Sequence, residues 1–281
     1  MSIKITADST CDLGTVLTEK YNVSIMPLTV LLGKDVYHDG VDITPQMIFD
    51  YVAANSILPK TSAPSVEDYT SFFAKHLEEY DHVIHFNISS KASASNSNAT
   101  QAAAAFKGKV DIIDTYALST GQGLLALKAC DFAAAGEKPA KIVKDIKALV
   151  PKVNTSFVPD RLDYLHKGGR CSLAALMGAK VLRLHPLISM KEGQLYAKKK
   201  YMGNLDACIR KYVDDLVEEY PAYDRTRCFI THSSAEPETV AKARALVESK
   251  FGFDEVIETV AGSVVTSHCG KNTLGVLFIA E

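Results

Sequence analysis

Apolar and polar positions alternate along the first half of the chain in a way that predicts strands and helices in succession. Apolar runs typical of strands are expected at residues 3–7, 23–32, 82–88 and 110–115. Amphipathic stretches typical of helices are expected at residues 13–21, 98–106, 123–135 and 139–150, and two more begin at Pro45 and after Ser65. Strands that alternate with helices this regularly indicate a parallel sheet with helices on both faces.

Local signals indicate where several of these elements begin or bend. Thr44 followed by Pro45 is typical of a helix start, with the threonine as N-cap and the proline in the first turn. Ser65 and Asp68 have the spacing of a capping box for the next helix. Pro27 lies inside one expected strand and places that strand at a sheet edge or at a bulge.

The pattern changes near residues 151–153, and the second half predicts a further group of elements. Helices are expected at residues 162–167, 173–182, 205–217 and 237–251, strands at 228–232, 256–260 and 276–279, and a hairpin with strands at 185–189 and 195–199. Asn204 is expected to cap one helix, and Gly193 to take a positive φ in the hairpin turn. We therefore predict an α/β fold with two α/β domains, 1–153 and 154–281, of which the first contains a mainly parallel sheet flanked by helices.

Two short segments rich in hydroxyl side chains come just before expected helices. They are residues 60–65 (KTSAPS) and residues 89–95 (SSKASAS). Backbone N–H groups at a helix start, with Ser and Thr hydroxyls beside them, form a favourable site for an anion. A third polar segment, residues 8–12 (DSTCD), follows the first strand, at the sheet edge where open α/β folds bind ligands. Because the motifs for a transferable phosphate are missing, we expect the anion to be a carboxylate.

Several kinds of site are disfavoured by missing motifs. The chain has no G-x-x-x-x-G-K-[ST] phosphate loop, and residues 121–123 (GQG) lack the third glycine of a dinucleotide fingerprint. His82 and His85 fall on opposite faces of an expected strand, and no cluster of metal-ligating residues accompanies them. We therefore expect neither a cofactor nor a metal.

Composition and charge narrow the class of protein further. The 281 residues carry a formal net charge of -2, which gives no electrostatic argument for binding nucleic acid or an anionic membrane. No apolar run approaches the roughly 20 residues that span a bilayer, and residues 1–10 lack the apolar core of a signal peptide. The six cysteines lie far apart without a C-x-x-C pair, as expected for reduced thiols. We expect a cytoplasmic protein with no integral membrane segment.

Two interpretations stay open for the serines and for one arginine. A hydrolase or acyltransferase would use Ser62 or Ser93 with His268, which lies in a loop bounded by glycines, although a G-x-S-x-G elbow is missing. Hydroxyl-rich loops are otherwise typical of capping and turn chemistry. Arg170 follows two glycines, and it would either contact the last carbonyls of a helix or present its guanidinium to a carboxylate, a phosphate or a partner.

Taken together, the motifs resemble those of the DegV family, bacterial fatty-acid-binding proteins of which some are the acyl-carrying subunit of fatty acid kinase. The resemblance runs from end to end of the chain. It comprises, in order, TADSTCDL, MPLTV, KTSAPS, the ISS-x-x-S element at residues 88–93, IIDTYALSTGQG, LDYLHKGGRCS and SVVTSHCGKNTLGV. Each motif is short, but their order and spacing together are specific to the family.

The resemblance implies a long-chain fatty acid between the two domains, with its carboxylate bound at one end. Thr61, Ser62 and Ser93 would contact or organise that carboxylate, and His268 would complete the network. Arg170 would lie on the surface that docks the catalytic subunit of fatty acid kinase. The protein would then be a carrier without enzymatic activity of its own, which presents the carboxylate for acyl-phosphate formation. A lipid-sensing regulatory protein with the same pocket is a further alternative.

Three positions depart from the family pattern. Ala94 stands where the family commonly has glycine, and Lys271-Asn272 stand where Pro-Gly commonly follows Gly270. His185 replaces the usual lysine before Pro186. We expect the first two departures to alter the segments around the carboxylate.

Overall fold

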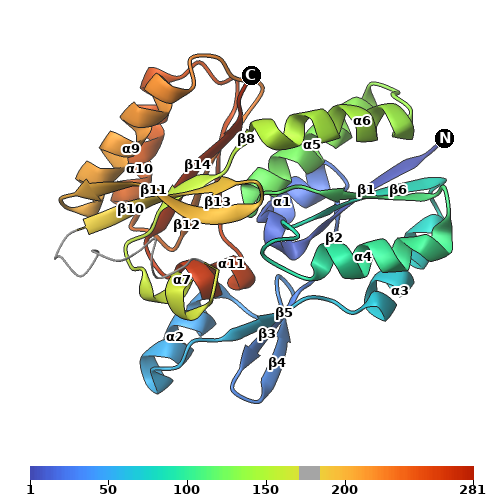
Figure 1. Ribbon diagram of the computed structural model, residues 1–281, viewed down its shortest axis with the longest axis horizontal. Coiled ribbons are helices and arrows are strands. Elements are labelled where there is room, and N and C mark those ends of the chain that lie inside the picture. Colours follow the sequence, from blue (N-terminus) through green and yellow to red (C-terminus); the bar gives the residue numbers. More distant parts are fainter. Residues whose placement is uncertain (171–183) are drawn as a thin grey trace.

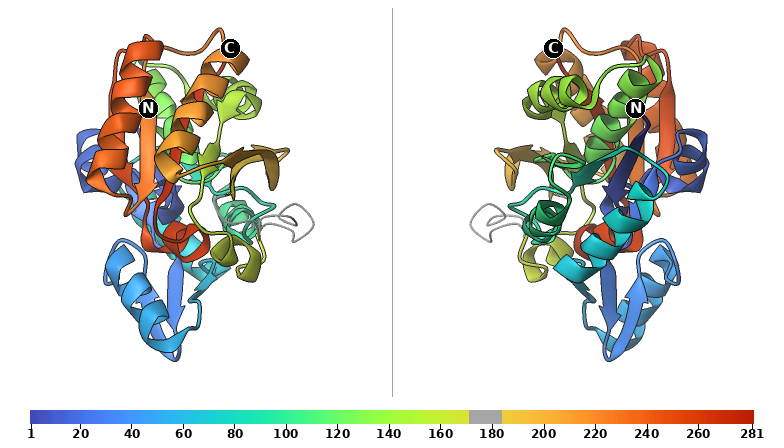
Figure 2. Two further views of the ribbon diagram at one scale, coloured as in Figure 1. Left: turned by 90° about the vertical axis from the view of Figure 1, so that its left-hand side faces the viewer. Right: turned by 90° about the vertical axis from the view of Figure 1, so that its right-hand side faces the viewer.

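The computed structural model describes residues 1–170 and 184–281, which form two sheets flanked by helices. Figure 1 shows these sheets side by side, with a smaller sheet and one helix projecting below them. Both side views in Figure 2 show the same projection. The fold is therefore α/β, with a parallel N-terminal sheet and a mixed C-terminal sheet. The helix expected at residues 173–182, and Cys171, lie outside the described residues.

The N-terminal sheet contains four parallel strands in the spatial order β2-β1-β6-β7, as expected for the first half of the chain. Helices α3 and α4 cover one face, and α5 and α6 cover the other. Alternation along β6 explains this, because Val83 packs toward α3 and α4 while Ile84 and Phe86 pack toward α5. The strands are β1 Ile3–Asp8, β2 Ser24–Met26, β6 His82–Asn87 and β7 Val110–Asp114, the helices are α1 Gly14–Lys20, α3 Val66–Leu77, α4 Ser95–Ala103, α5 Thr120–Ala134 and α6 Pro139–Leu149, and short 3-10 turns lie at Ser9–Cys11, Ala104–Phe106 and Val150–Lys152.

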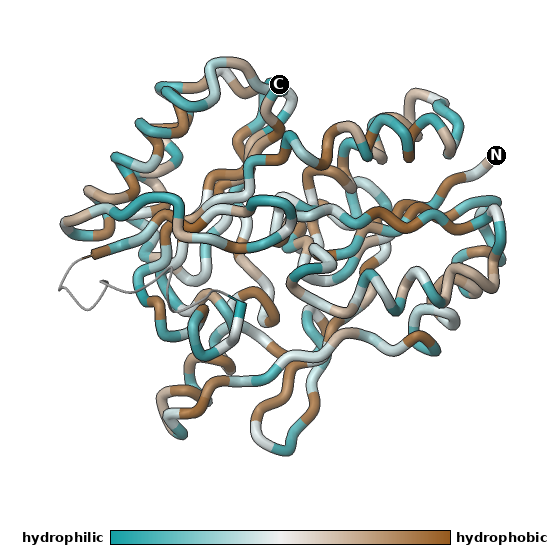
Figure 3. The backbone as a smooth tube through the Cα atoms, in the orientation of Figure 1, coloured by the Kyte–Doolittle hydropathy of each residue, from teal (hydrophilic) through white to brown (hydrophobic). Residues whose placement is uncertain are grey.

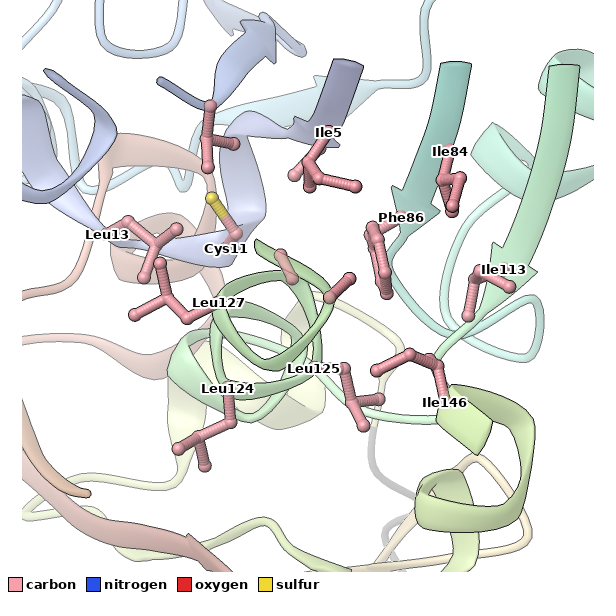
Figure 4. Packing of buried hydrophobic residues seen from close by; sticks show 14 of the residues in the cluster. Ile5, Cys11, Leu13, Ile84, Phe86, Ile113, Leu124, Leu125, Leu127 and Ile146 are labelled. Atoms are coloured by element: carbon pink, nitrogen blue, oxygen red, sulfur yellow. The ribbon is translucent and has the colours of Figure 1, made fainter. Parts of the chain in front are cut away.

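Helix α5 lies between the two large sheets and is buried on most sides. Its Leu124 and Leu125 belong to the same buried cluster as Phe86 of β6, and also as Leu277 of the C-terminal sheet (Figure 4). Full burial of one such leucine stabilises the fold by about 1.5–3 kcal/mol. Gly123, in the GQG segment at the start of α5, allows this close packing, because a Cβ there would lie 2.7 Å from the Leu13 side chain.

The C-terminal sheet is mixed, in the order β11-β10-β9-β14-β12-β13 with β8 beside β14. Among the described strands of this sheet, only β12 and β13 pair in parallel. Helices α9 and α10 cover one face, and Figure 3 shows hydrophobic and hydrophilic positions alternating along both. The strands are β8 Val153–Asn154, β9 Ser156–Val158, β10 Leu184–Lys191, β11 Gln194–Met202, β12 Cys228–Ser233, β13 Val256–Val260 and β14 Thr273–Ile279, and the helices are α7 Asp163–Lys167, α9 Leu205–Glu219, α10 Pro237–Lys250 and α11 Ser263–Cys269.

The projecting part is a small antiparallel sheet, β4-β3-β5, with helix α2. Its elements are β3 Thr29–Leu32, β4 Asp35–His38, β5 Lys60–Ser62 and α2 Pro45–Asn55. The single strand expected at residues 23–32 is therefore wrong, because the chain leaves the parallel sheet at Met26, next to Pro27, and enters the small sheet at Thr29. The KTSAPS segment begins as strand β5 rather than as a loop, since residues 60–62 pair with β3.

Some of the other local predictions are confirmed, and others are wrong. The Thr44 side chain accepts a hydrogen bond from the Met47 N–H, and both halves of the Ser65–Asp68 capping box are formed. The loop predicted around His268 is wrong, because the segment is helix α11, whose apolar side packs under the small sheet. The predicted boundary between the two domains falls inside β8 and stays a prediction. No helix among the described residues is long and apolar enough to cross a bilayer.

Candidate functional site

One pocket brings the two hydroxyl-rich segments together with helix α11. Its volume is about 590 Å³, including the part open to solvent. All five residues that the sequence singled out lie along its wall, namely Thr61, Ser62, Ser93, Arg170 and His268. The remaining wall is almost wholly apolar and consists of Leu28, Ala63, Ile88, Ala92, Leu118, Leu165, Leu195, Val264, Val265 and Cys269. The pocket therefore has a polar end and an apolar body.

A hydrogen bond between Thr61 and His268 defines the polar end. Thr61 lies on β5 and His268 on α11, and their Oγ1 and Nε2 atoms are 2.8 Å apart. Helix α11 contacts α7 and the small sheet, which brings together residues 207 positions apart in the sequence (Figure 1). Gly270, which ends α11, has a φ of 75°, and a Cβ there would lie 2.8 Å from the Tyr164 ring. This glycine thus lets the α11 end pack closely against α7.

The His268 imidazole is neutral at pH 7. Burial, and secondarily the positive charge of Arg170, lower the pKa of His268 to about 4. Its Nδ1 atom has no hydrogen-bond partner among the described residues. The backbone of α7 comes close on that side, because a Cβ at Gly168 would lie 2.6 Å from Nδ1. His268 therefore supplies no positive charge to a ligand in this pocket.

The serines form local hydrogen bonds. The hydroxyl oxygens of Ser93 and Ser95 are 2.9 Å apart, and the Ser95 N–H donates to Ser93 Oγ over 3.2 Å. Among the described residues, the Ser62 hydroxyl donates to the carbonyl of its neighbour Ala63, over 3.2 Å. Ala94, which replaces the usual glycine, has a φ of −74°, which any residue adopts without strain. The backbone of the second segment therefore accommodates this substitution.

The tip of the β10–β11 hairpin covers one side of the pocket. The Ser89 hydroxyl donates to the Gly193 carbonyl over 2.7 Å, so the hairpin tip is attached to the second hydroxyl-rich segment. Gly193 has the positive φ expected from the sequence, 80°, and a Cβ there would lie 2.6 Å from Ser89 Oγ. Leu195, on the hairpin, lines the pocket directly and is one of the residues that the sequence did not single out.

The first interpretation of Arg170, a contact with the last carbonyls of a helix, is confirmed, and its role toward a ligand or partner stays a prediction. Its Nη1 donates to the Gly168 carbonyl over 2.7 Å, as expected for an arginine at a helix C-terminus. The preceding Gly169 has a φ of 70° and reverses the chain after α7. The Arg170 side chain is also exposed and lines the pocket, so its guanidinium remains accessible from solvent.

Two buried acids hold the start of α11, and sequence patterns do not predict their pairing. The Gly262 N–H donates to Asp12 over 2.8 Å, and the Ser263 N–H donates to Asp39 over 2.7 Å. Ser119 donates to the other Asp12 oxygen over 2.6 Å. Burial above all, with a smaller contribution from Asp39, raises the pKa of Asp12 to about 8. The helix that carries His268 is thus positioned by residues near the N-terminus.

A second, smaller pocket continues from the apolar body of the first. It has a volume of about 340 Å³ and shares Leu118, Val265 and Cys269 with the first pocket. Phe157 and Leu277 of the C-terminal sheet lie along its far wall. The two pockets are therefore neighbours, and polar residues such as Thr231, His232 and Ser233 also line the second.

Metal and disulfide chemistry find no support among the described residues. No group of three or more His, Cys, Asp or Glu side chains there could hold a metal ion. The described cysteines are free thiols, at Cys11, Cys130, Cys208, Cys228 and Cys269.

Comparisons with known proteins agree with the geometry. The chain matches the profile of the DegV family, described as uncharacterised proteins, over residues 2–281. A DegV domain-containing protein of Deinococcus radiodurans is 30% identical and covers 98% of each chain, and a fatty acid-binding protein of Thermotoga maritima is 29% identical over 98% of this chain and 96% of its own. The solved structure of a fatty-acid-binding DegV family protein from Thermus thermophilus superposes with a TM-score of 0.92 at 30% identity and covers 100% of both chains. This chain therefore belongs to the DegV family.

Proposed function

We propose that this protein binds a long-chain fatty acid, with the carboxylate at Thr61, Ser62, Ser93 and His268. The observation that carries the proposal is the 2.8 Å Thr61–His268 hydrogen bond at the polar end of an otherwise apolar pocket. The fatty-acid-binding relatives from Thermotoga maritima and Thermus thermophilus support it, since they match over nearly the whole chain. The ligand would lie between the domains at 1–153 and 154–281.

Neutral donors would hold the carboxylate. A buried N–H without a partner is rarer in proteins than a buried acceptor without one, and His268 Nδ1 has no partner among the described residues. This favours a proton on Nε2, donated to Thr61 Oγ1, which leaves the Thr61 hydroxyl proton free for the ligand. Ser62 and Ser93 supply further hydroxyl donors. Arg170 is the positive charge at the rim that would partly balance the carboxylate.

The acyl tail would follow the apolar body of the pocket toward the smaller pocket at Phe157 and Leu277. Each buried CH₂ contributes about 0.8 kcal/mol, so a long acyl chain supplies on the order of 10 kcal/mol before the costs of binding. The tail would then set most of the affinity. The polar end would set the orientation and the preference for an acid over a neutral head group.

Replacing Thr61 tests this proposal. The affinities of hexadecanoic acid and hexadecanol are measured for the wild type and for Thr61→Val, which keeps the side-chain volume. We expect Thr61→Val to weaken binding of the acid about tenfold and of the alcohol much less, because a hydrogen bond to a charged group contributes about 1.5–3 kcal/mol. Thr70→Val is the matched control, since Thr70 bonds within α3 to the Val66 carbonyl. Mass spectrometry of organic extracts that found no acyl ligand, with no binding of added acid, would reject the proposal.

We further propose that the bound carboxylate is presented to the catalytic subunit of fatty acid kinase, with Arg170 at the docking surface. Its exposed guanidinium beside the polar end of the pocket supports this role. In a reconstituted kinase assay, Arg170→Ala should abolish phosphoryl transfer while the lipid stays bound. Wild-type protein that binds lipid but supports no transfer with any such kinase would instead indicate a lipid-sensing regulator.

The geometry favours binding over hydrolysis. A serine hydrolase needs a serine within hydrogen-bond reach of its histidine and an acid that orients the ring. Here His268 Nε2 contacts Thr61, Ser93 contacts Ser95, and Nδ1 has no acidic partner among the described residues. A turnover of chromogenic acyl esters that disappears in Ser93→Ala would nevertheless establish the hydrolase.

A further inference from the structure

The DSTCD segment lines a further cavity, separate from the proposed fatty acid site. This cavity has a volume of about 670 Å³, including the part open to solvent. No described residue lines both this cavity and the pocket that contains Thr61 and His268. Fatty acid binding therefore does not account for the ligand-binding edge that the sequence indicates at residues 8–12.

The cavity lies at the carboxyl ends of three strands. Ser9 and Asp12 follow β1, Ile25 lies near the end of β2, and Val260 is the last residue of β13. Ligands of open α/β sheets bind at such ends. Gly40, in the turn after β4, also lines the cavity, and a Cβ there would meet no atom of the described residues within 4 Å. The structure thus leaves room for a ligand at this edge.

Two buried acids line the cavity, and one of their oxygens lacks a donor. Asp12 and Asp39 are only 4% and 2% exposed. Asp12 accepts hydrogen bonds from Gly262 and Ser119, and Asp39 Oδ1 accepts one from the Ser263 N–H. The other oxygen of Asp39, Oδ2, is buried without a hydrogen-bond partner among the described residues. Because a buried carboxyl oxygen without a donor is costly, this position favours a ligand that donates hydrogen bonds.

Gly262 keeps the space between the two acids free of a side chain. A Cβ at this glycine would lie 3.1 Å from Asp12 Oδ1, and 3.1 and 3.2 Å from the two oxygens of Asp39. Gly262 itself lines the cavity. Three carboxyl oxygens therefore lie around one place at the cavity wall, which suits a group with several donors.

Donors but no cations surround the acid pair. Burial above all raises the pKa of both acids, that of Asp12 to about 8. Hydroxyl and backbone N–H groups oppose part of each rise, and the Ser9 hydroxyl does so for Asp39. In the described part of the chain, no cationic side chain is among these groups. A cation that entered the cavity would therefore supply a charge that the protein itself does not provide there.

The rest of the wall indicates what kind of cation fits. Its apolar residues are Leu13, Ile25, Pro27, Val41 and Val260, of which Val41 and Val260 are 72% and 51% exposed. No group of three acidic, histidine or cysteine side chains within the described ranges could hold a metal ion here. An ammonium group offers three N–H donors and a positive charge, and an apolar body attached to it would match the wall.

We propose that this cavity binds a small organic ammonium compound. Its N–H groups donate to Asp39 Oδ2 and to Asp12, and its apolar body lies against Ile25, Val41 and Val260. The cavity is thus a binding site additional to the fatty acid site, with the opposite preference for charge.

Isothermal titration calorimetry with cyclohexylammonium and cyclohexanol tests this proposal. The two probes share one ring and differ in charge, and at pH 8 the amine is protonated. We expect the wild type to bind the ammonium ion about tenfold more tightly than the alcohol, because hydrogen bonds to charged groups are the stronger ones. Asp39→Asn, which keeps the shape of the side chain, should abolish this preference. Failure of the wild type to bind the ammonium ion, or equal affinities for both probes, would overturn the proposal.

Asp35→Asn is the matched control. Asp35 is an exposed residue of β4 in the same small sheet and does not line the cavity, so this variant changes the net charge equally. Its preference for the ammonium ion should equal that of the wild type. If Asp35→Asn lost as much of the preference as Asp39→Asn, general attraction to an acidic protein would explain the binding, and the proposal would fail.

A second variant keeps the test decisive if Asp39→Asn folds poorly. Val41→Lys places a positive charge beside the cavity at an exposed position, so the fold should tolerate it. We expect it to weaken binding of the ammonium ion about tenfold through repulsion. Val36→Lys is its control, since Val36 is 56% exposed on β4 and does not line the cavity. Equal effects of the two lysines would contradict the proposed place of binding.

Competition separates this site from the fatty acid site. Saturation with hexadecanoic acid should leave the affinity for cyclohexylammonium unchanged, because the two sites share no described wall residue. Displacement of the ammonium ion by the acid would place it in the fatty acid pocket and overturn the proposal. Binding of magnesium ions without binding of the ammonium ion would also overturn it, in favour of an inorganic cation site. Failure of hexadecanoic acid to bind would instead reject the proposed function alone.

Discussion

Asp8 and Asp12 lie at the two ends of the DSTCD segment, and both are buried, with 0% and 4% exposure. Their surroundings differ. Asp8 accepts hydrogen bonds from Tyr69, Asn87 and Ile88 of the N-terminal half. Asp12 instead reaches Gly262 at the start of α11, 250 residues later, where Asp39 is its neighbour.

The difference shows that one residue type performs two structural tasks within five positions. Around Asp8, the carboxyl group accepts hydrogen bonds from several donors of neighbouring elements. Around Asp12, two carboxyl groups share the start of one short helix, and burial works against charge on both. Asp8 therefore holds β1 against α3 and β6, and Asp12 joins the N-terminal half to helix α11, which carries His268.

The largest expected effect comes from Asp8→Asn. The amide would direct an NH₂ group at donors such as the Tyr69 hydroxyl or the Ile88 N–H, and leave them without an acceptor. We expect a loss of about 3–4 kcal/mol in the free energy of unfolding, because several buried donors would be left unsatisfied. Urea unfolding monitored by circular dichroism measures this loss. A loss of stability smaller than that of Gly262→Val would show that the hydrogen bonds to Asp8 contribute less than their number indicates.

Asp12→Asn should become more stable relative to the wild type as the pH rises. The folded pKa of Asp12, about 8, lies above its ordinary value of 3.8, so the folded state holds this proton more tightly. The wild type should therefore lose stability between about pH 4 and pH 8, with a slope approaching 1.4 kcal/mol per pH unit. Asparagine stays neutral and tolerates the left-handed φ of 50° at this position.

The measurement is urea unfolding of both proteins at pH 5, 6, 7 and 8. From pH 5 to pH 7 we expect the variant to gain about 2–3 kcal/mol relative to the wild type. Groups common to both proteins cancel in this difference. A difference that stayed constant with pH would mean that Asp12 is charged throughout, and would contradict the raised pKa.

In Gly262→Val, the volume of the valine side chain should disturb the pair formed by Asp12 and Asp39. A Cβ at Gly262 would lie 3.1 Å from an oxygen of Asp12 and 3.1 and 3.2 Å from both oxygens of Asp39. We expect a loss of about 2 kcal/mol from overpacking, and weaker fatty acid binding as α11 shifts with His268. Gly252→Val is the control, because a Cβ there meets only the flexible end of Arg225. Equal losses in both variants would contradict a tight acid pair.

Ser119→Ala should have the smallest effect. The Ser119 hydroxyl donates to Asp12 over 2.6 Å, and removing this donor should cost about 1 kcal/mol. The loss should be greater at pH 8 than at pH 5, because hydrogen bonds to a charged acceptor are stronger. In the Asp12→Asn background the pH dependence of the loss should vanish. Its persistence there would assign the effect to packing.

Much of the fold could be predicted because its signals are local. The caps at Thr44, Ser65 and Asn204 specify helix starts through side chains three positions from their donors, and all three are formed. The hairpin at Gly193 follows from a turn that needs a positive φ. Period and capping act over a few residues, so a single sequence displays them directly.

The missed elements depend on distant contacts. Helix α11 has seven residues, too few for a clear period, and it forms where the small sheet and α7 cover it. Strand β5 has three residues and is a strand only because β3 lies beside it. The break at Pro27 separates strands β2 and β3. The apolar run continues across this break, so the sequence predicted a single strand.

The candidate site could be predicted only in part from the sequence. Chemistry pointed to the hydroxyl-rich segments, but the family resemblance, and not spacing, joined Thr61 with His268. Their roles in binding a carboxylate stay predictions, although one pocket holds both. Asp39 carries no local signal at all, because its partner Ser263 lies 224 positions later. Contacts over such separations are set by tertiary packing, which periodicity does not encode.

The position of strand β14 within the C-terminal sheet affects how the chain can fold during its synthesis. It is the last strand of the chain, yet it lies in the middle of the C-terminal sheet, between β9 and β12. Domains generally fold as they emerge from the ribosome, N-terminal parts first. Here the sheet stays divided until Thr273–Ile279 has been synthesised. The smaller pocket, whose wall includes Thr273, Gly275 and Leu277 of β14, is therefore completed only when this strand has been made.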